Sequence, residues 1–231
     1  MKLFLVLLSL SLFISASAQD CKGYYYLKAG EVEMTLYDRK NSETGKLKYL
    51  VSDVSKAGAA TVATFNSEMF NEKGKSLSKS TGKYKCENGV LFVDAKVAMA
   101  GDPSGQFNNT DVKAVENFIE YPSDLSEGKE LKDVSATMEV EREGGMKSTV
   151  YFEQTNRKVA GKESVTTPAG TWECWKITYN AQMKLSMGGI GIPVRMKVTE
   201  WFAPGLGIIK SETLNKNGKM MGSMILTKLQ K

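Results

Sequence analysis

The sequence predicts a mainly β protein whose antiparallel strands form one or more curved sheets. Apolar and polar residues alternate through most of the chain after the first eighteen residues, a period of two that is typical of half-buried strands. Turn sequences rich in glycine, asparagine and proline separate these segments, and helices do not alternate with them. Strands at this density favour a barrel or half-barrel, with a two-sheet sandwich as the alternative.

The clearest predicted strand covers residues 171–187. From Trp175 to Met187 every second residue is apolar, and the residues between them are polar. This pattern places one face in the core and the other in solvent. The glycine-rich residues 188–191 predict a hairpin turn between this strand and a returning one. They do not resemble a phosphate-binding loop, because they lack its Lys-Ser or Lys-Thr. Val194, Met196 and Val198 then continue an apolar face on the returning strand.

A second hairpin is predicted on either side of residues 144–146. A three-residue loop there sets Val140 opposite Val150 and Met138 opposite Phe152, which keeps apolar side chains on one face. Three glutamates alternate with them on the other face. We interpret these glutamates as a solvated surface rather than a metal or acid–base site.

One short helix is expected near residues 110–120. Thr110 or Asp111 could cap its start, the apolar residues that follow have helical spacing, and Pro122 would end it. Residues 96–109 are rich in glycine and polar residues and predict a loop. The remaining strands are expected at residues 31–37, 47–54, 60–70, 76–86, 90–95, 208–214 and 220–229.

The first eighteen residues predict an export signal. Lys2 precedes an apolar run that is too short to span a bilayer, and Ala16-Ser17-Ala18 offers the small residues that signal peptidase needs. The mature chain, residues 19–231, is expected to be one mainly β domain without a transmembrane segment. A subdivision near residues 96–133 is left open. The expected location is the periplasm, the outer cell surface or the medium.

Composition argues against catalysis. The chain has no histidine, which removes the commonest general base and metal ligand. The cysteines are too far apart in sequence to resemble a metal motif. We therefore expect a protein that is not an enzyme and has no metal and no cofactor. The net charge of +5 is spread along the chain without a basic run, so no nucleic-acid partner is expected.

Two of the three cysteines are expected to pair in an exported protein. Cys21 lies near the mature N-terminus and Cys86 lies where a strand enters a turn, so we predict a Cys21–Cys86 disulfide. Cys174 lies in an apolar strand and would pack as a small apolar residue. The alternatives are that all three thiols are reduced, or that Cys21 carries a lipid anchor.

Three segments together resemble a known family. They are residues 121–131 (YPSDLSEGKEL), 165–177 (VTTPAGTWECWKI) and 200–212 (EWFAPGLGIIKSE). Their order is similar to that of the TapB-like proteins, exported domains of unknown function related to a wider DUF-type envelope group of Bacteroidetes-type bacteria. The resemblance implies an envelope or secreted protein with an antiparallel β fold. It implies no catalytic residues.

The function expected from these observations is binding of an apolar or amphipathic ligand such as a lipid. A curved sheet can enclose a cavity, and methionine suits an adaptable apolar wall. An ordinary filled core is the alternative interpretation of these residues. A structural or protein-interaction role in the envelope, with a protein partner, is the alternative function. The candidate ligand-binding residues are Trp175, Tyr179, Met183, Met187, Met196 and Trp201.

Overall fold

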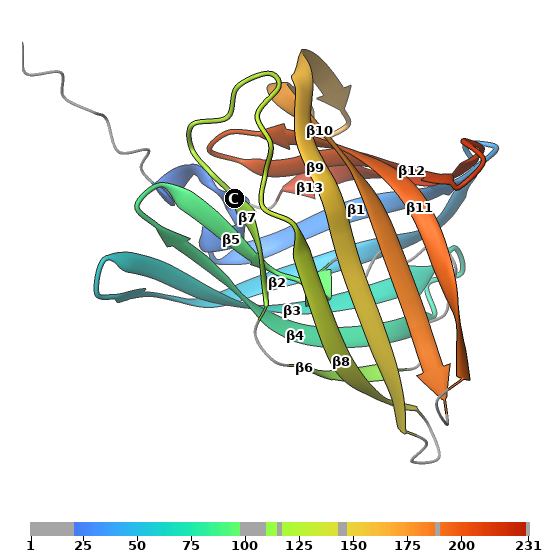
Figure 1. The fold of residues 1–231 in the computed structure, drawn as a ribbon. Coiled ribbons are helices and arrows are strands. Elements are labelled where there is room, and N and C mark those ends of the chain that lie inside the picture. Colours follow the sequence, from blue (N-terminus) through green and yellow to red (C-terminus); the bar gives the residue numbers. More distant parts are fainter. Residues whose placement is uncertain (1–20, 98–109, 115–116, 143–146, 188–189, 230–231) are drawn as a thin grey trace, which may run out of the picture.

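A computed structural model describes residues 21–97, 110–114, 117–142, 147–187 and 190–229. The predicted export signal lies outside these residues. Two short 3-10 helices, η1 and η2, precede the strands β1–β13 (Figure 1). Their bounds are η1 Cys21–Gly23, η2 Tyr25–Leu27, β1 Gly30–Asp38, β2 Glu43–Ala57, β3 Ala60–Asn71, β4 Ser76–Glu87, β5 Val90–Asp94, β6 Thr110–Ala114, β7 Phe118–Tyr121, β8 Val134–Arg142, β9 Lys147–Thr167, β10 Gly170–Met187, β11 Ile190–Ala203, β12 Gly207–Asn215 and β13 Met220–Leu229.

The strands form one sheet that curls into a nearly closed barrel. Hydrogen-bonded neighbours follow the order β3-β2-β1-β13-β12-β11-β10-β9-β8-β6-β4-β5-β7, and β3 also pairs with β4. Among the described residues all pairings are antiparallel except the one between β4 and β6, where a single parallel pair, Lys79 and Asp111, links the two sides of the curled sheet. In Figure 1, β8–β11 run steeply along one wall while β1–β4 cross behind them. The predicted barrel-like fold is confirmed, and the two-sheet sandwich is not what forms.

The prediction of a helix near residues 110–120 is wrong. This segment contains strands β6 and β7; β6 pairs with β8, and β7 pairs with β5. The segment is rich in β-branched and aromatic residues, including Val112, Phe118 and Ile119. Such residues fit a sheet surface well, and pairing with β5 and β8 outweighs the helical spacing.

The β8–β9 hairpin forms, but its predicted register is shifted by two residues. Met138 pairs with Val150 and Ala136 with Phe152, whereas the sequence predicted Met138 opposite Phe152. The loop residues 143–146 lie outside the described residues. A shift of two leaves every side chain on its original face, so alternation alone could not exclude it.

The N-terminal residues close one end of the core. The side chains of Tyr24, Tyr25 and Tyr26 are buried. The Tyr25 hydroxyl donates a hydrogen bond to the Ile208 carbonyl at 3.0 Å, and the Tyr26 ring packs 4.6 Å from that of Tyr84. We call residues 21–27 the N-terminal plug.

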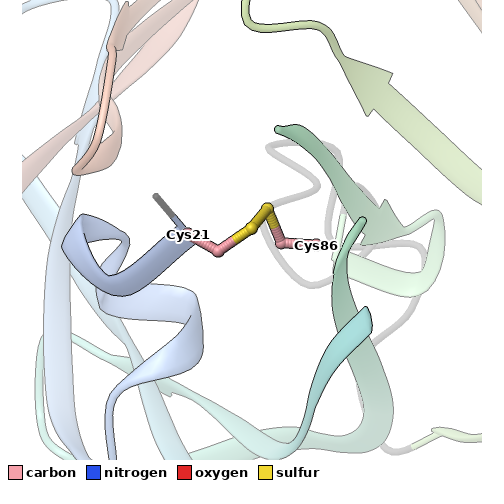
Figure 2. The surroundings of a disulfide bond; sticks show 2 residues. All are labelled: Cys21 and Cys86. Atoms are coloured by element: carbon pink, nitrogen blue, oxygen red, sulfur yellow. A yellow bond between two sulfur atoms is a disulfide. The ribbon is translucent and has the colours of Figure 1, made fainter. Parts of the chain in front are cut away.

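The predicted disulfide ties this plug to the barrel. Cys21 of η1 is bonded to Cys86 of β4 across 65 residues of sequence (Figure 2). Cys174 is a free, buried thiol, as expected. Burial raises the pKa of the Cys174 thiol to about 11, which makes it a poor nucleophile.

Candidate functional site

The inside of the barrel contains a pocket of about 90 Å³ beside β9, β10 and β11. Its wall is mainly apolar and is contributed by strands on opposite sides of the barrel. The apolar lining residues are Val93, Val97, Ile119, Phe152, Ala181, Met183, Met196, Val198, Ile208 and Met224. Three of them are methionines, whose unbranched side chains adapt readily to an apolar guest.

A buried carboxyl group forms the polar end of this pocket. Glu200 of β11 accepts a hydrogen bond from the Tyr121 hydroxyl at 2.9 Å and another from the Tyr179 hydroxyl at 2.5 Å. Tyr121 comes from β7 and Tyr179 from β10, so the barrel brings together groups that are far apart in sequence. Each carboxyl oxygen of Glu200 therefore has one phenolic donor.

Burial sets the protonation of this group. It raises the pKa of Glu200 above the ordinary value of 4.5, although the Tyr179 hydrogen bond, the Arg157 charge and the Tyr121 hydrogen bond act in the opposite direction. Burial also raises the pKa values of Tyr121 and Tyr179 well above 10, and the negative charge of Glu200 adds to this effect. Both phenols thus remain protonated donors at neutral pH.

Gln154 of β9 adds a second buried acceptor to the pocket lining. Its side chain is 1% exposed, and its Oε1 atom has no hydrogen-bond donor in the part of the chain that the structure describes. A buried acceptor without a donor is energetically costly, since it has lost its contact with water. The pocket therefore contains an oxygen that a bound molecule could satisfy.

Arg157 lies behind the polar end and does not line the pocket. Its guanidinium donates to the Lys132 carbonyl at 2.7 Å and to the Glu120 carbonyl at 3.2 Å, and it lies 5.4 Å from the centre of the Tyr121 ring. These bonds tie β7 and the segment that follows it to β9. They also fix Tyr121 beside Glu200.

A second, more polar depression of about 150 Å³ adjoins the pocket. The two share the lining residues Ser211, Thr213 and Met224 of β12 and β13. The far side of the depression is formed by the ends of β1 and β2 and includes Tyr37 and Thr44.

The structure brings together three of the six predicted ligand-binding residues. Tyr179, Met183 and Met196 line the pocket. Trp175 is half-buried on β10 and does not line it. The side chain of Met187 lies outside the described residues.

Trp201 belongs to the other face of β11. Its ring lies 4.5 Å from the Lys210 ammonium and 5.5 Å from that of Lys176, and its indole N–H donates to Glu163. It is one residue removed from Glu200, and neighbouring residues of a strand point to opposite faces. Trp201 is therefore covered by charged side chains rather than available to the pocket.

Sequence reasoning missed the polar end of the pocket. One signal could have found Glu200: it interrupts the apolar alternation of Met196, Val198 and Phe202 on the inward face of its strand. A charged residue at such a position is seldom buried without a partner or a function. Gln154 and Tyr121 carried no comparable signal.

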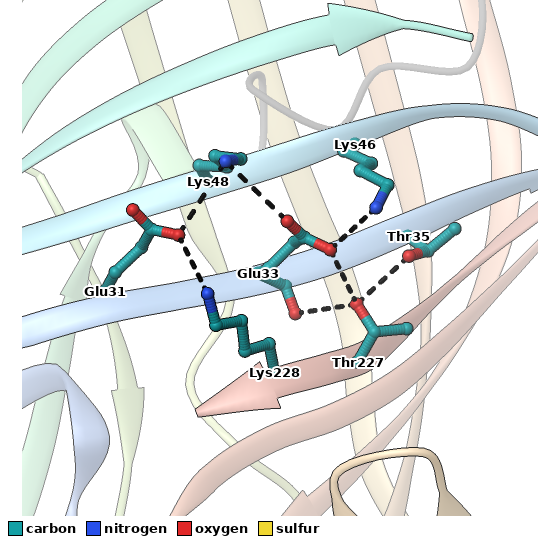
Figure 3. A network of polar contacts seen from close by, with 7 residues as sticks. All are labelled: Glu31, Glu33, Thr35, Lys46, Lys48, Thr227 and Lys228. Atoms are coloured by element: carbon teal, nitrogen blue, oxygen red, sulfur yellow. Dashed lines mark hydrogen bonds and ion pairs between the residues drawn. The ribbon is translucent and has the colours of Figure 1, made fainter. Parts of the chain in front are cut away.

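The outer face of β1, β2 and β13 has a network of charged side chains (Figure 3). Glu33 contacts Lys46 at 3.0 Å and Lys48 at 3.8 Å, and Glu31 contacts Lys48 and Lys228. Burial alone would raise the pKa of Glu33, but the hydrogen bond and charge of Lys46 outweigh it, so the pKa is lowered. Each of these charged side chains has a partner of opposite sign, so the network is a paired surface rather than an open binding site.

The described residues contain no cluster of three or more cysteine, aspartate and glutamate side chains arranged to hold a metal ion. Nor does a helix within those residues have the length and apolar character needed to cross a membrane.

Comparisons with known proteins identify the family. The sequence model of the DUF3108-like family matches residues 28–226, so the chain belongs to that family. This agrees with the DUF-type membership expected from the three sequence segments. No curated protein matches the chain.

Two crystal structures share the fold. A Bacteroides fragilis protein, described as exported with a YmcC-like fold, is 21% identical with a TM-score of 0.72, and the match covers 88% of this chain and 97% of that one. A Parabacteroides distasonis protein, described as a lipoprotein, is 23% identical with a TM-score of 0.73, and the match covers 92% of this chain and all of the other. At these identities the likeness establishes the architecture.

Proposed function

We propose that this protein is an exported, non-catalytic binding module that holds an apolar or amphipathic ligand inside its barrel. The interior pocket carries the proposal, because an apolar wall that ends in a few buried polar groups is the usual form of a small-molecule site. Tyr179, Met183 and Met196 are its central contacts.

The volume of the pocket limits what can bind. An apolar cavity of about 150 Å³ in another protein accommodates benzene. The 90 Å³ of the pocket and the 150 Å³ of the adjoining depression therefore suit a single slender chain. A lipid with two acyl chains would have to leave most of its apolar surface outside the barrel.

Export to the periplasm, the outer surface or the medium is part of the proposal. The sequence of residues 1–18 supports it, and so does the Cys21–Cys86 disulfide, because such bonds persist mainly in oxidising compartments. The descriptions of the two structural neighbours as exported or lipoprotein agree with this location.

Native mass spectrometry tests the function. Protein purified from its own cell envelope is expected to carry an added mass that disappears on denaturation. Val198→Phe, which fills the pocket, should remove this mass. Thr199→Phe is the matched control, since Thr199 is also half-buried but lies on the opposite face of β11.

Two results would contradict the proposal. A wild-type mass equal to that of the polypeptide alone would exclude a resident ligand and favour the structural or protein-interaction role. A Val198→Phe protein that folds and keeps the same added mass would place the ligand elsewhere.

A further inference from the structure

The pocket lining offers acceptors at two places: at Gln154, which lies opposite Ala181 and so level with Met196, and at Glu200, four residues further along β11. Gln154 Oε1 is buried without a donor among the described residues, and the two Glu200 oxygens have one donor each. A carboxyl oxygen can accept more than one hydrogen bond. A ligand atom that reaches either place must therefore bring a hydrogen.

The charges around the pocket disfavour an anionic head. No lysine or arginine is found among the described residues that line it. The nearby cation, Arg157, uses its terminal nitrogens on the carbonyls of Glu120 and Lys132. A carboxylate or phosphate would be taken out of water beside Glu200 without a counter-charge, which is costly.

An ammonium head also fits poorly. It has three donors, but Gln154 offers one unpartnered oxygen, and the two Glu200 oxygens, which already have a donor each, lie four residues further along β11, roughly 13 Å in the strand direction. An ammonium placed at Gln154 would therefore carry the desolvation penalty of a charge away from the Glu200 carboxylate. A hydroxyl has a single donor, which matches the one unpartnered oxygen of Gln154.

We infer that the pocket selects a single-chain amphiphile with a hydroxyl head, which donates its hydrogen to Gln154 while the chain lies along Met183, Met196 and Met224. This inference rests on the proposed function, because it requires that the pocket takes a ligand at all. It adds the chemical class of the head group and the residue that recognises it.

The test uses three probes with chains of the same length: hexan-1-ol, hexanoate and 1-chlorohexane. Binding to mature, ligand-free protein at pH 7 is followed by NMR through the amide shifts of β9 and β11. Hexan-1-ol is expected to bind about fivefold to tenfold more tightly than 1-chlorohexane, the effect of one hydrogen bond to a buried acceptor. Hexanoate should bind more weakly than either.

Gln154→Leu should abolish the preference for hexan-1-ol over 1-chlorohexane and leave the affinity for 1-chlorohexane within about twofold, since only a hydrogen bond is lost. Gln182→Leu is the matched control, because Gln182 lies on the outer side of β10 beside Arg195. The control should retain the preference.

The outcomes separate the two proposals. If 1-chlorohexane or hexanoate binds wild-type protein as tightly as hexan-1-ol, the head-group inference is overturned while the binding function stands. If none of the three shifts the amides of β9 and β11, the inference and the proposed pocket function fail together. The wild-type comparison decides the inference even if Gln154→Leu does not fold.

Discussion

Removing the Cys21–Cys86 disulfide should destabilise the protein substantially. The bond closes a loop that spans 65 residues of sequence. The loop-closure relation gives an entropy of about 14 cal/mol/K for such a loop, or about 4 kcal/mol at 25 °C. For a domain of this size, this loss lowers Tm by roughly 8–16 °C.

The assay is urea unfolding of the double variant Cys21→Ala/Cys86→Ala, followed by circular dichroism and compared with reduced wild-type protein. Alanine is preferable to serine because Cys86 is fully buried, and a hydroxyl there would lack a partner. Cys174→Ala is the control, since it removes a buried thiol without opening a loop. It should cost about 1 kcal/mol.

The disulfide also has a local effect that can be measured. The Tyr25 amide donates to the Leu206 carbonyl at 3.0 Å, so the N-terminal plug is held by hydrogen bonds as well as by the disulfide. Hydrogen exchange of the plug amides should accelerate in the double variant while the amides of β10 and β11 remain protected. A loss of less than about 1 kcal/mol in both the variant and the reduced protein would refute the loop-closure reasoning.

Three further predictions concern single residues. Because burial raises the folded pKa of Glu200, the contribution of this group to stability is fully present below pH 4.5 and is lost as pH rises through the folded pKa. Glu200→Gln should remove this contribution, and a difference in unfolding free energy between the two proteins that stays constant from pH 4 to 8 would contradict it. Gly207→Ala should lower the free energy of unfolding by about 2–4 kcal/mol, because φ is +134° and a Cβ atom would lie 2.6 Å from the Tyr25 ring. Gly218→Ala is the control: its φ is +77° but a Cβ atom there would meet open space, so it should cost only about 1 kcal/mol in the same urea assay. Arg157→Lys should lower the free energy of unfolding by about 1–3 kcal/mol, since an ammonium cannot reproduce the hydrogen bonds of the guanidinium to the carbonyls of Glu120 and Lys132. Thermal unfolding indistinguishable from wild type would show that these hydrogen bonds are dispensable.

The candidate site could be predicted only where it follows local alternation. Tyr179 and Met183 lie four residues apart on one face of β10, and Met196 occupies the corresponding face of β11, opposite Ala181. The sequence placed all three on an inward face, and they line the pocket. Trp201 was misassigned because its aromatic character was given more weight than its position one residue out of that alternation.

The register of paired strands and the type of some elements could not be predicted in the same way. In β8 and β9 a slip of two residues keeps Met138 and Val150 inward, so the loop and the neighbouring strands select the register. Residues 110–120 have both helical spacing and β-branched residues, and contacts with β5 and β8 decide between them.

The sequence by itself determined the antiparallel strands and most of their turns, because side-chain alternation and turn chemistry act over a few residues. It also predicted the Cys21–Cys86 pairing, because an exported chain with three cysteines, one of them in an apolar strand, favours this pair. Only the tertiary structure decided that the sheet closes into a barrel, and that Tyr121 of β7 meets Glu200 of β11 at the end of an apolar pocket. The contact between Tyr121 and Glu200 depends on the strand order and on the register of every neighbouring strand pair around the barrel. Both are set by packing between segments that are far apart in sequence.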